Sequence, residues 1–103
     1  MTPAHSSLPD ISITQLQYLV AVQESPTWAS AAKALGVSQS ALSQGLAELQ
    51  RRLGIELFSW NGRRRVPASS TAEITEHARR ILALTSDLSG WSDRIRAGSA
   101  GKL

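Results

Sequence analysis

The sequence predicts a mainly α-helical fold with three short helices, a two-stranded hairpin and a long C-terminal helix. Three observations carry this prediction. An Ala-rich segment ends at Gly36, and Ser38 begins a Leu-striped segment directly afterwards, which is the pattern of a helix-turn-helix. Asn61-Gly62 separates two short β-prone runs, and that dipeptide favours a hairpin. Apolar residues then recur every three or four positions from Ile74 to Ile95. Together they predict a winged helix-turn-helix followed by a long dimerisation helix.

The size and composition restrict the function. A chain of 103 residues, 42% of them hydrophobic, has room for one small core. The absence of Cys excludes disulfides, thiolate metal sites and Cys nucleophiles. Two His and scattered acids match neither a metal-ligand spacing nor a nucleophile with its base, so we expect no metal, no cofactor and no enzyme. Without a signal peptide or an apolar run of roughly 20 residues, the expectation is a cytoplasmic protein that does not enter membranes.

The positive charge is concentrated in one part of the chain. The net charge is +3 and the isoelectric point is about 10.2. Six basic and two acidic residues lie between positions 27 and 72, which leaves a net charge of −1 for the remainder. A concentrated basic surface suits a phosphate backbone, although an ordinary basic soluble domain has the same composition.

The first helices are predicted from their capping signals. Residues 1–12 show no periodicity and are expected to form a disordered arm. Thr14 and Gln17 fit a capping box, so the first helix is expected to start at Thr14. Thr27 is the expected cap of the second helix, and Gly36 is placed to end it in a left-handed conformation.

The third helix is predicted to be two-faced. Ser38 caps it and Gly54 ends it. At about 100° per residue, one side carries Leu42, Leu46, Leu49 and Leu53, and the other carries Ser40, Ser43, Gln44, Ala47 and Arg51, with Gln39 on the flank. Gln and Ser side chains can bond base edges in a major groove. A plain solvated face is the alternative, but such faces usually carry several Glu and Lys, which the first two turns lack.

The hairpin is expected to form a basic wing. Ile55–Trp60 is predicted as the first strand and Arg63–Pro67 as the second, joined at Asn61-Gly62. Three consecutive Arg at the tip favour contact with a phosphate backbone. A solvated basic loop is the alternative.

The last helix carries an apolar seam over about three heptads. A terminal helix of so small a domain cannot bury such a stripe against itself, so pairing with a second copy is expected; folding back on the domain's own core is the alternative. The predicted dimer-interface residues are Ile74, His77, Ile81, Leu84, Leu88 and Trp91. The predicted organisation is an arm (1–12), a DNA-binding domain (13–68), a linker and dimerisation helix (69–96) and a flexible tail (97–103).

The sequence resembles the N-terminal domain of LysR-type transcriptional regulators. The resemblance covers about residues 13 to 88, and the run Val37–Ser43 (Val-Ser-Gln-Ser-Ala-Leu-Ser) is its most specific part. Matching segments also lie at Leu16–Val22, Leu53–Phe58 and His77–Leu82.

The resemblance implies a winged helix-turn-helix whose linker helix pairs antiparallel with that of a second chain, giving a homodimer on double-stranded DNA. The implied base contacts are Gln39, Ser40, Ser43 and Gln44. The expected phosphate contacts are Thr27, Ser38, Arg51, Arg63, Arg64 and Arg65.

Several positions depart from the family pattern. Gln44 stands where the family often has Arg, Gly45 replaces a larger residue, and Trp60 replaces a wing Arg. The family's effector-binding domain is absent from these 103 residues, which indicates an excised domain or a truncated relative. A sequence-specific transcriptional regulator is therefore the leading hypothesis. A winged-helix module for dimerisation or protein docking is the second, and an enzyme is the third.

Overall fold

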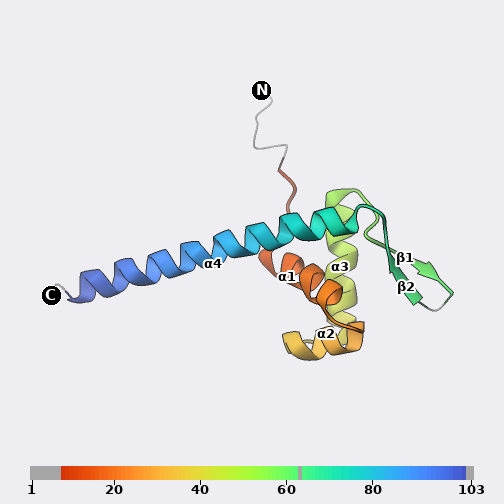
Figure 1. The fold of residues 1–103 in the computed structure, drawn as a ribbon, viewed down its shortest axis with the longest axis horizontal. Helices are drawn as coiled ribbons and strands as arrows, with labels where there is room; N and C mark the ends of the chain where they lie inside the picture. The colour runs from red at the N-terminus through yellow and green to blue at the C-terminus, as the bar shows by residue number, and fades with distance from the viewer. Residues whose placement is uncertain (1–7, 63, 102–103) are drawn as a thin grey trace, which may run out of the picture.

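The order of the elements confirms the predicted fold class (Figure 1). The structure, a computed structural model, describes residues 8–62 and 64–101. Three helices form a head, a hairpin projects from one side of it, and a long helix lies across the head and extends well beyond it. The elements are α1 (Ile13–Glu24), α2 (Trp28–Leu35), α3 (Gln39–Leu53), β1 (Phe58–Asn61), β2 (Arg64–Pro67) and α4 (Thr71–Gly101).

Helix α1 begins one residue earlier than predicted, and its capping residue is Ser12 rather than Thr14. The Ser12 hydroxyl accepts from the Gln15 backbone N–H, and the Gln15 side chain accepts from the Ser12 N–H, each at 3.1 Å. The predicted box between Thr14 and Gln17 is therefore wrong. Both pairs have the Ser/Thr-x-x-Gln spacing, and the chain uses the first of the two.

The predicted turn between α2 and α3 is confirmed. The Thr27 hydroxyl accepts from the Ser30 N–H at 3.0 Å and caps α2. Gly36 ends that helix with φ 73°, a left-handed conformation that favours glycine. The Ser38 hydroxyl then accepts from the Ala41 N–H at 3.0 Å and caps α3. Gly54 ends α3 with φ 72°.

The core lies where α1, α2, α3 and the start of α4 meet. Ala31 and Ala32 are buried, and their small side chains let α2 approach its neighbours closely. The predicted Leu stripe of α3 faces this core. The fully or nearly buried apolar residues are Leu16, Leu19, Val22, Ala31, Ala32, Leu42, Leu46, Leu49, Leu57 and Ala78.

The wing is an antiparallel hairpin whose first strand starts later than predicted. Phe58 pairs with Pro67 and Asn61 with Arg64, so Asn61 is the last residue of β1 rather than part of the turn. The turn starts at Gly62, which has φ 66°. Ile55 lies in the connection after α3 and not in a strand. Arg63 lies outside the described residues.

The first turns of α4 are packed onto the head. Thr71 and Thr75 are buried, and their hydroxyls donate to the Leu57 carbonyl at 2.6 Å and to the Thr71 carbonyl at 2.7 Å. The Leu57 carbonyl also accepts from the Ala68 N–H at 2.9 Å. Ile74, predicted for the dimer interface, is half-buried and packs against this core.

Both ends of the chain differ from the predicted boundaries. Helix α4 continues through Gly101, whereas a tail was predicted from residue 97. Residues 102–103 lie outside the described part, as do residues 1–7 of the predicted arm. The rest of that arm takes part in the fold, because Ile11 packs against the core and Arg52 donates to the Asp10 carbonyl at 2.7 Å. Among the described helices, none combines the length and apolar character needed to cross a bilayer.

Candidate nucleic-acid interface

Helix α3 presents a polar face on the side opposite its buried Leu residues. Gln39, Ser40 and Gln44 are exposed, and Ser43 is half-buried at the side that faces the wing. The helix has no acidic residue before Glu48. The N-terminus of a helix carries a partial positive charge, so this end of α3 favours an anionic partner. The predicted base-contact residues therefore lie together on one accessible surface.

The start of α3, the start of α2 and the wing line one shallow groove. Thr27, Gln39, Arg64 and Arg65 all contribute to it, and the groove has a volume of about 390 Å³. Pro26, Trp28 and Trp60 complete the lining. The fold thus brings together four residues that the sequence assigned to bases or phosphates, from the starts of two consecutive helices and from the wing.

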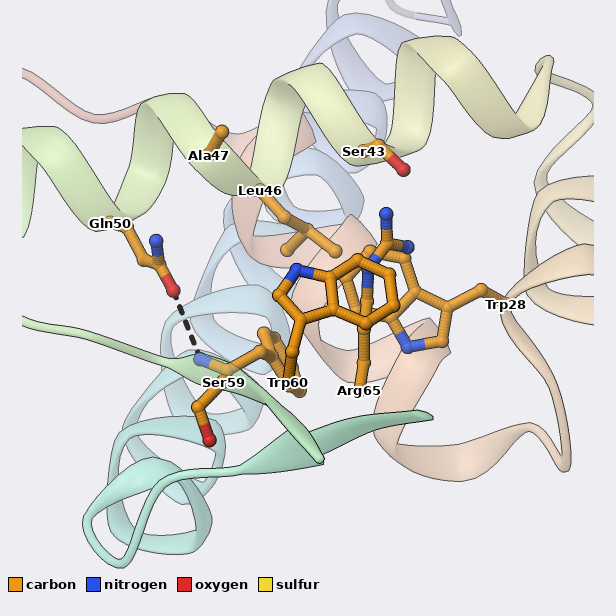
Figure 2. A pocket seen from close by; sticks show the side chains of 9 residues that line it. Trp28, Ser43, Leu46, Ala47, Gln50, Ser59, Trp60 and Arg65 are labelled. Carbon is orange, nitrogen blue, oxygen red and sulfur yellow. Dashed lines mark hydrogen bonds between the residues drawn. The ribbon is translucent and has the colours of Figure 1, made fainter. Parts of the chain in front are cut away.

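A stack of aromatic and cationic side chains lies next to this groove (Figure 2). The Arg65 guanidinium carbon lies 4.0 Å from the centroid of the Trp28 ring and 4.7 Å from that of the Trp60 ring. The Trp28 ring also meets Phe58 edge-on, with centroids 5.1 Å apart. Sequence reasoning missed this stack. The pairing of Trp60 with Arg65 follows from the hairpin register. The contact with Trp28 does not, because Trp28 belongs to a different element.

Gln50 connects α3 to the base of the wing. Its side-chain carbonyl oxygen accepts from the Leu57 N–H at 2.8 Å and from the Phe58 N–H at 2.9 Å. Two backbone donors at the start of β1 are thereby satisfied. Gln50 also lines the pocket of about 170 Å³ between α3 and the hairpin (Figure 2). It was not assigned a role from the sequence, because a lone Gln gives no signal of such a contact.

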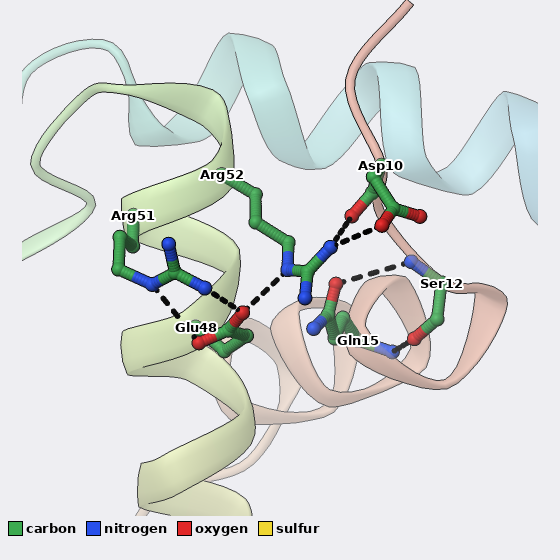
Figure 3. A network of polar contacts seen from close by, with 6 residues as sticks. All are labelled: Asp10, Ser12, Gln15, Glu48, Arg51 and Arg52. Atoms are coloured by element: carbon green, nitrogen blue, oxygen red, sulfur yellow. Dashed lines mark hydrogen bonds and ion pairs between the residues drawn. The ribbon is translucent and has the colours of Figure 1, made fainter.

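The C-terminal end of α3 holds an ion-pair network (Figure 3). Glu48 pairs with both Arg51 and Arg52, and Arg52 also pairs with Asp10. The hydrogen bond from Arg51 lowers the pKa of Glu48 most, and the hydrogen bond from Arg52 lowers it further. Hydrogen bonds to Glu48 and Asp10 raise the pKa of Arg52. Arg51, predicted to contact phosphate, keeps 68% of its side chain exposed and remains accessible despite its pairing.

The free part of α4 carries the other predicted cluster, on a surface of its own. Five large apolar residues there are exposed, with Leu84 at 67%. His77 is exposed too, and its Nδ1 lies 2.7 Å from a guanidinium nitrogen of Arg80. We call these five residues the α4 stripe: Ile81, Leu84, Leu88, Trp91 and Ile95.

Comparison with known proteins identifies the family. Residues 13–85 match the family model for bacterial regulatory helix-turn-helix proteins of the lysR family. A probable hydrogen peroxide-inducible genes activator of Mycobacterium avium is 41% identical over an alignment of 91 residues, and the match covers 84% of this chain and 29% of that protein. The HTH-type transcriptional regulator YnfL of Escherichia coli K12 is 30% identical over 91% of this chain and 32% of its own length. The chain thus spans about a third of these relatives.

Solved structures with the same fold include complexes with DNA. The BenM DNA-binding domain with catB site 1 DNA has a TM-score of 0.77 and 26% identity, covering 85% of this chain and 95% of that chain. The CbnR DNA-binding domain with DNA has a TM-score of 0.72 and 36% identity, covering 86% of this chain and 99% of that chain. With its winged helix-turn-helix and a family match over most of its length, the chain belongs to the LysR family of bacterial regulatory helix-turn-helix proteins.

Proposed function

We propose that this chain binds duplex DNA in a sequence-specific manner and serves the regulation of transcription, with α3 in the major groove and the wing on the backbone. The observation that carries the proposal is the exposed polar face of α3, which has no acidic residue before Glu48. The BenM and CbnR domains support it, because both share this fold and were solved with DNA.

The chemistry of the α3 face suits base recognition. The 15 residues of α3 span about 22 Å at about 1.5 Å per residue, and a major groove about 12 Å wide admits a helix. Gln39 and Gln44 carry amides that can pair with an adenine edge, and the Ser40 hydroxyl can pair with several bases. Ser43 would act from the edge of this surface, beside the wing.

Phosphate contacts are proposed on either side of that helix. The first N–H groups of a helix have no partner within it, so the N–H groups of Trp28 and Ala29 at the start of α2 offer donors to a phosphate. Thr27 stays a proposed contact at the same helix end, although its own N–H and hydroxyl donate to the Ser30 hydroxyl in the capping box. The Ser38 hydroxyl accepts an N–H as a cap and still has its own proton to donate. Arg51 and Arg64 are exposed cations. Arg63, outside the described residues, stays a proposed contact on sequence grounds alone.

We also propose a homodimer that forms through the α4 stripe. The stripe lies about 120° around α4 from the side that packs onto the head, so one chain cannot bury both sides. Contiguous exposed apolar surface of this kind marks an interaction site. An antiparallel pair of α4 helices would cover the stripe of each chain with that of the other and would present two α3 helices to one duplex.

The test is a selection of bound duplexes from a random pool, followed by fluorescence anisotropy on the winning and scrambled sequences. We expect enrichment of a two-fold symmetric site, and affinity that falls steeply with salt as counterions are released. If the chain bound no duplex even at low salt, a docking or dimerisation module would replace this proposal.

A further inference from the structure

We propose that Arg65 sets the angle of the wing through its stack with Trp28 and Trp60, and does not act as a phosphate ligand. The inference rests on the proposed DNA binding, since the wing angle matters only if the wing meets the backbone beside α3. It separates Arg65 from Arg64, although the two are neighbours on β2.

The hairpin register places the stack on one side of the wing. Trp60 and Arg65 are directly paired across the strands, so their side chains lie on the same face. Phe58 is two residues before Trp60 and shares that face. The face is turned toward α2, where Trp28 meets Phe58 edge-on and lies against Arg65. Phe58 and Arg65 of the hairpin thus contact the Trp28 ring of the head, and Trp60 joins them through its contact with Arg65.

A two-stranded hairpin of four-residue strands is marginally stable by itself. At its base, Gln50 and Thr71 hold it by hydrogen bonds to residues 57 and 58. Those bonds fix the root of the wing but not the direction of its outer half. Trp60 and Arg65 lie in that outer half, and the stack connects it to Trp28 at the start of α2.

The stack also limits what Arg65 can do for a phosphate. Trp28 and Trp60 lie against the guanidinium group, and its end points toward Ser43 of α3 (Figure 2). The side chain is half-buried, whereas Arg64 is exposed. A planar guanidinium stacks on aromatic rings and a lysine ammonium does not reproduce that geometry. Charge alone would therefore not replace Arg65.

The experiment compares Arg65→Ala, Arg65→Lys, Trp60→Ala and the double variant Arg65→Ala/Trp60→Ala, with Arg64→Ala as the matched control. Each is titrated against the selected duplex over a range of salt concentrations, and thermal melting and near-UV circular dichroism are recorded for the free protein. We expect Arg65→Ala to weaken binding about tenfold, from the loss of two cation–π contacts. The slope of affinity against salt should stay as in the wild type.

The other variants separate positioning from charge. Arg65→Lys should bind almost as weakly as Arg65→Ala, and Trp60→Ala should show a similar loss although it removes no charge. The double variant should lose no more affinity than whichever single variant binds more weakly. Arg65→Ala and Trp60→Ala should both reduce the near-UV tryptophan signal, which Arg64→Ala should leave unchanged. If Arg65→Ala melts at a much lower temperature than the wild type, its loss of affinity no longer tests the role of Arg65. The affinities of Arg65→Lys and Trp60→Ala then decide between positioning and phosphate binding.

The opposite pattern would overturn the inference. A salt slope lower by about one for Arg65→Ala, full rescue by Arg65→Lys and an additive double variant would make Arg65 a phosphate ligand. That result would leave the proposed function standing. Failure of the wild type to bind any duplex would instead remove the proposed function, and this inference with it.

Discussion

The ring of Tyr18 lies against the backbone of Gly45, so that a β-carbon at position 45 would come within 2.6 Å of two ring atoms. Glycine in the middle of a helix costs up to about 1 kcal/mol relative to alanine. In this chain it lets α1 and α3 approach each other, with an aromatic ring between them. A residue with a β-carbon would have no room at this position unless the Tyr18 ring moved.

Gly45→Ala is therefore expected to destabilise the fold, although it improves the intrinsic helix propensity. Overpacking of this kind costs about 1–3 kcal/mol, which corresponds to a fall in melting temperature of several degrees for a domain of this size. Thermal melting by circular dichroism measures it. Gly90→Ala is the matched control, because a β-carbon there meets only the end of Arg94 at 3.6 Å and should raise the melting temperature. Equal stabilisation by both changes would contradict the packing argument.

Gln44→Ala should narrow the difference in affinity between the selected duplex and a scrambled one. A good bidentate base contact accounts for about 1–3 kcal/mol of discrimination, so the selected duplex should lose about tenfold or more while the scrambled duplex stays unchanged. Arg64→Ala should weaken both duplexes alike and lower the salt slope by about one. Anisotropy titrations at several salt concentrations measure both quantities. The division between α3 and the wing fails if the two variants behave in the same way.

Leu84→Asp should convert the proposed dimer to a monomer. A carboxylate in the middle of an apolar interface must be desolvated without a partner, so the dissociation constant of the dimer should rise about a hundredfold or more. Sedimentation equilibrium distinguishes the 11.1 kDa chain from twice that mass. Ala83→Asp is the matched control, because Ala83 is exposed on another side of α4 and should leave the dimer intact. A wild-type chain that is monomeric at high concentration would exclude this use of the stripe.

The Glu48 network should make stability depend on pH in the acid range. The hydrogen bonds from Arg51 and Arg52 hold the folded-state pKa of Glu48 below its ordinary value of 4.5. The folded state therefore binds the proton less readily than the unfolded state, and the stabilisation is complete above about pH 4.5 and lost as the pH falls through the lowered pKa. The melting temperature of Glu48→Gln should lie below that of the wild type at pH 7.

The difference in melting temperature between Glu48→Gln and the wild type should shrink between pH 5 and pH 3. It should also shrink at high salt, because the three side chains are accessible to solvent and screening weakens their pairing. Melting curves across that range, at low and high salt, measure both effects. A difference that is constant with pH would mean that Glu48 acts through packing and not through its charge.

Local signals explain which parts of the fold could be predicted from the sequence. Gly36, Ser38 and Gly54 act on the backbone next to them, so their roles as caps follow from their position alone. The Leu stripe of α3 follows from helical periodicity in the same way. The start of α1 was predicted wrongly because Ser12 and Thr14 are each followed three residues later by a Gln. Only packing distinguishes these two overlapping capping boxes.

Two of the contacts that the sequence did not reveal join distant segments. Trp28 and Arg65 are 37 positions apart, and Tyr18 and Gly45 are 27 apart. Nothing in the local pattern around Trp60 or Gly45 indicates a partner, so each reads as a departure from the family when taken alone. In the fold both have a physical reason, since Trp60 belongs to the Arg65 stack and Gly45 makes room for a ring.

The Leu57 carbonyl receives two donors, one from the residue that follows β2 and one from the first residue of α4. One oxygen atom is therefore the shared hydrogen-bond acceptor for the end of the hairpin and the start of the long helix. A tilt of α4 relative to the head would pull on the same peptide group from which the wing departs. The orientation of the long helix and the root of the hairpin are therefore both anchored at one buried residue of the core, Leu57.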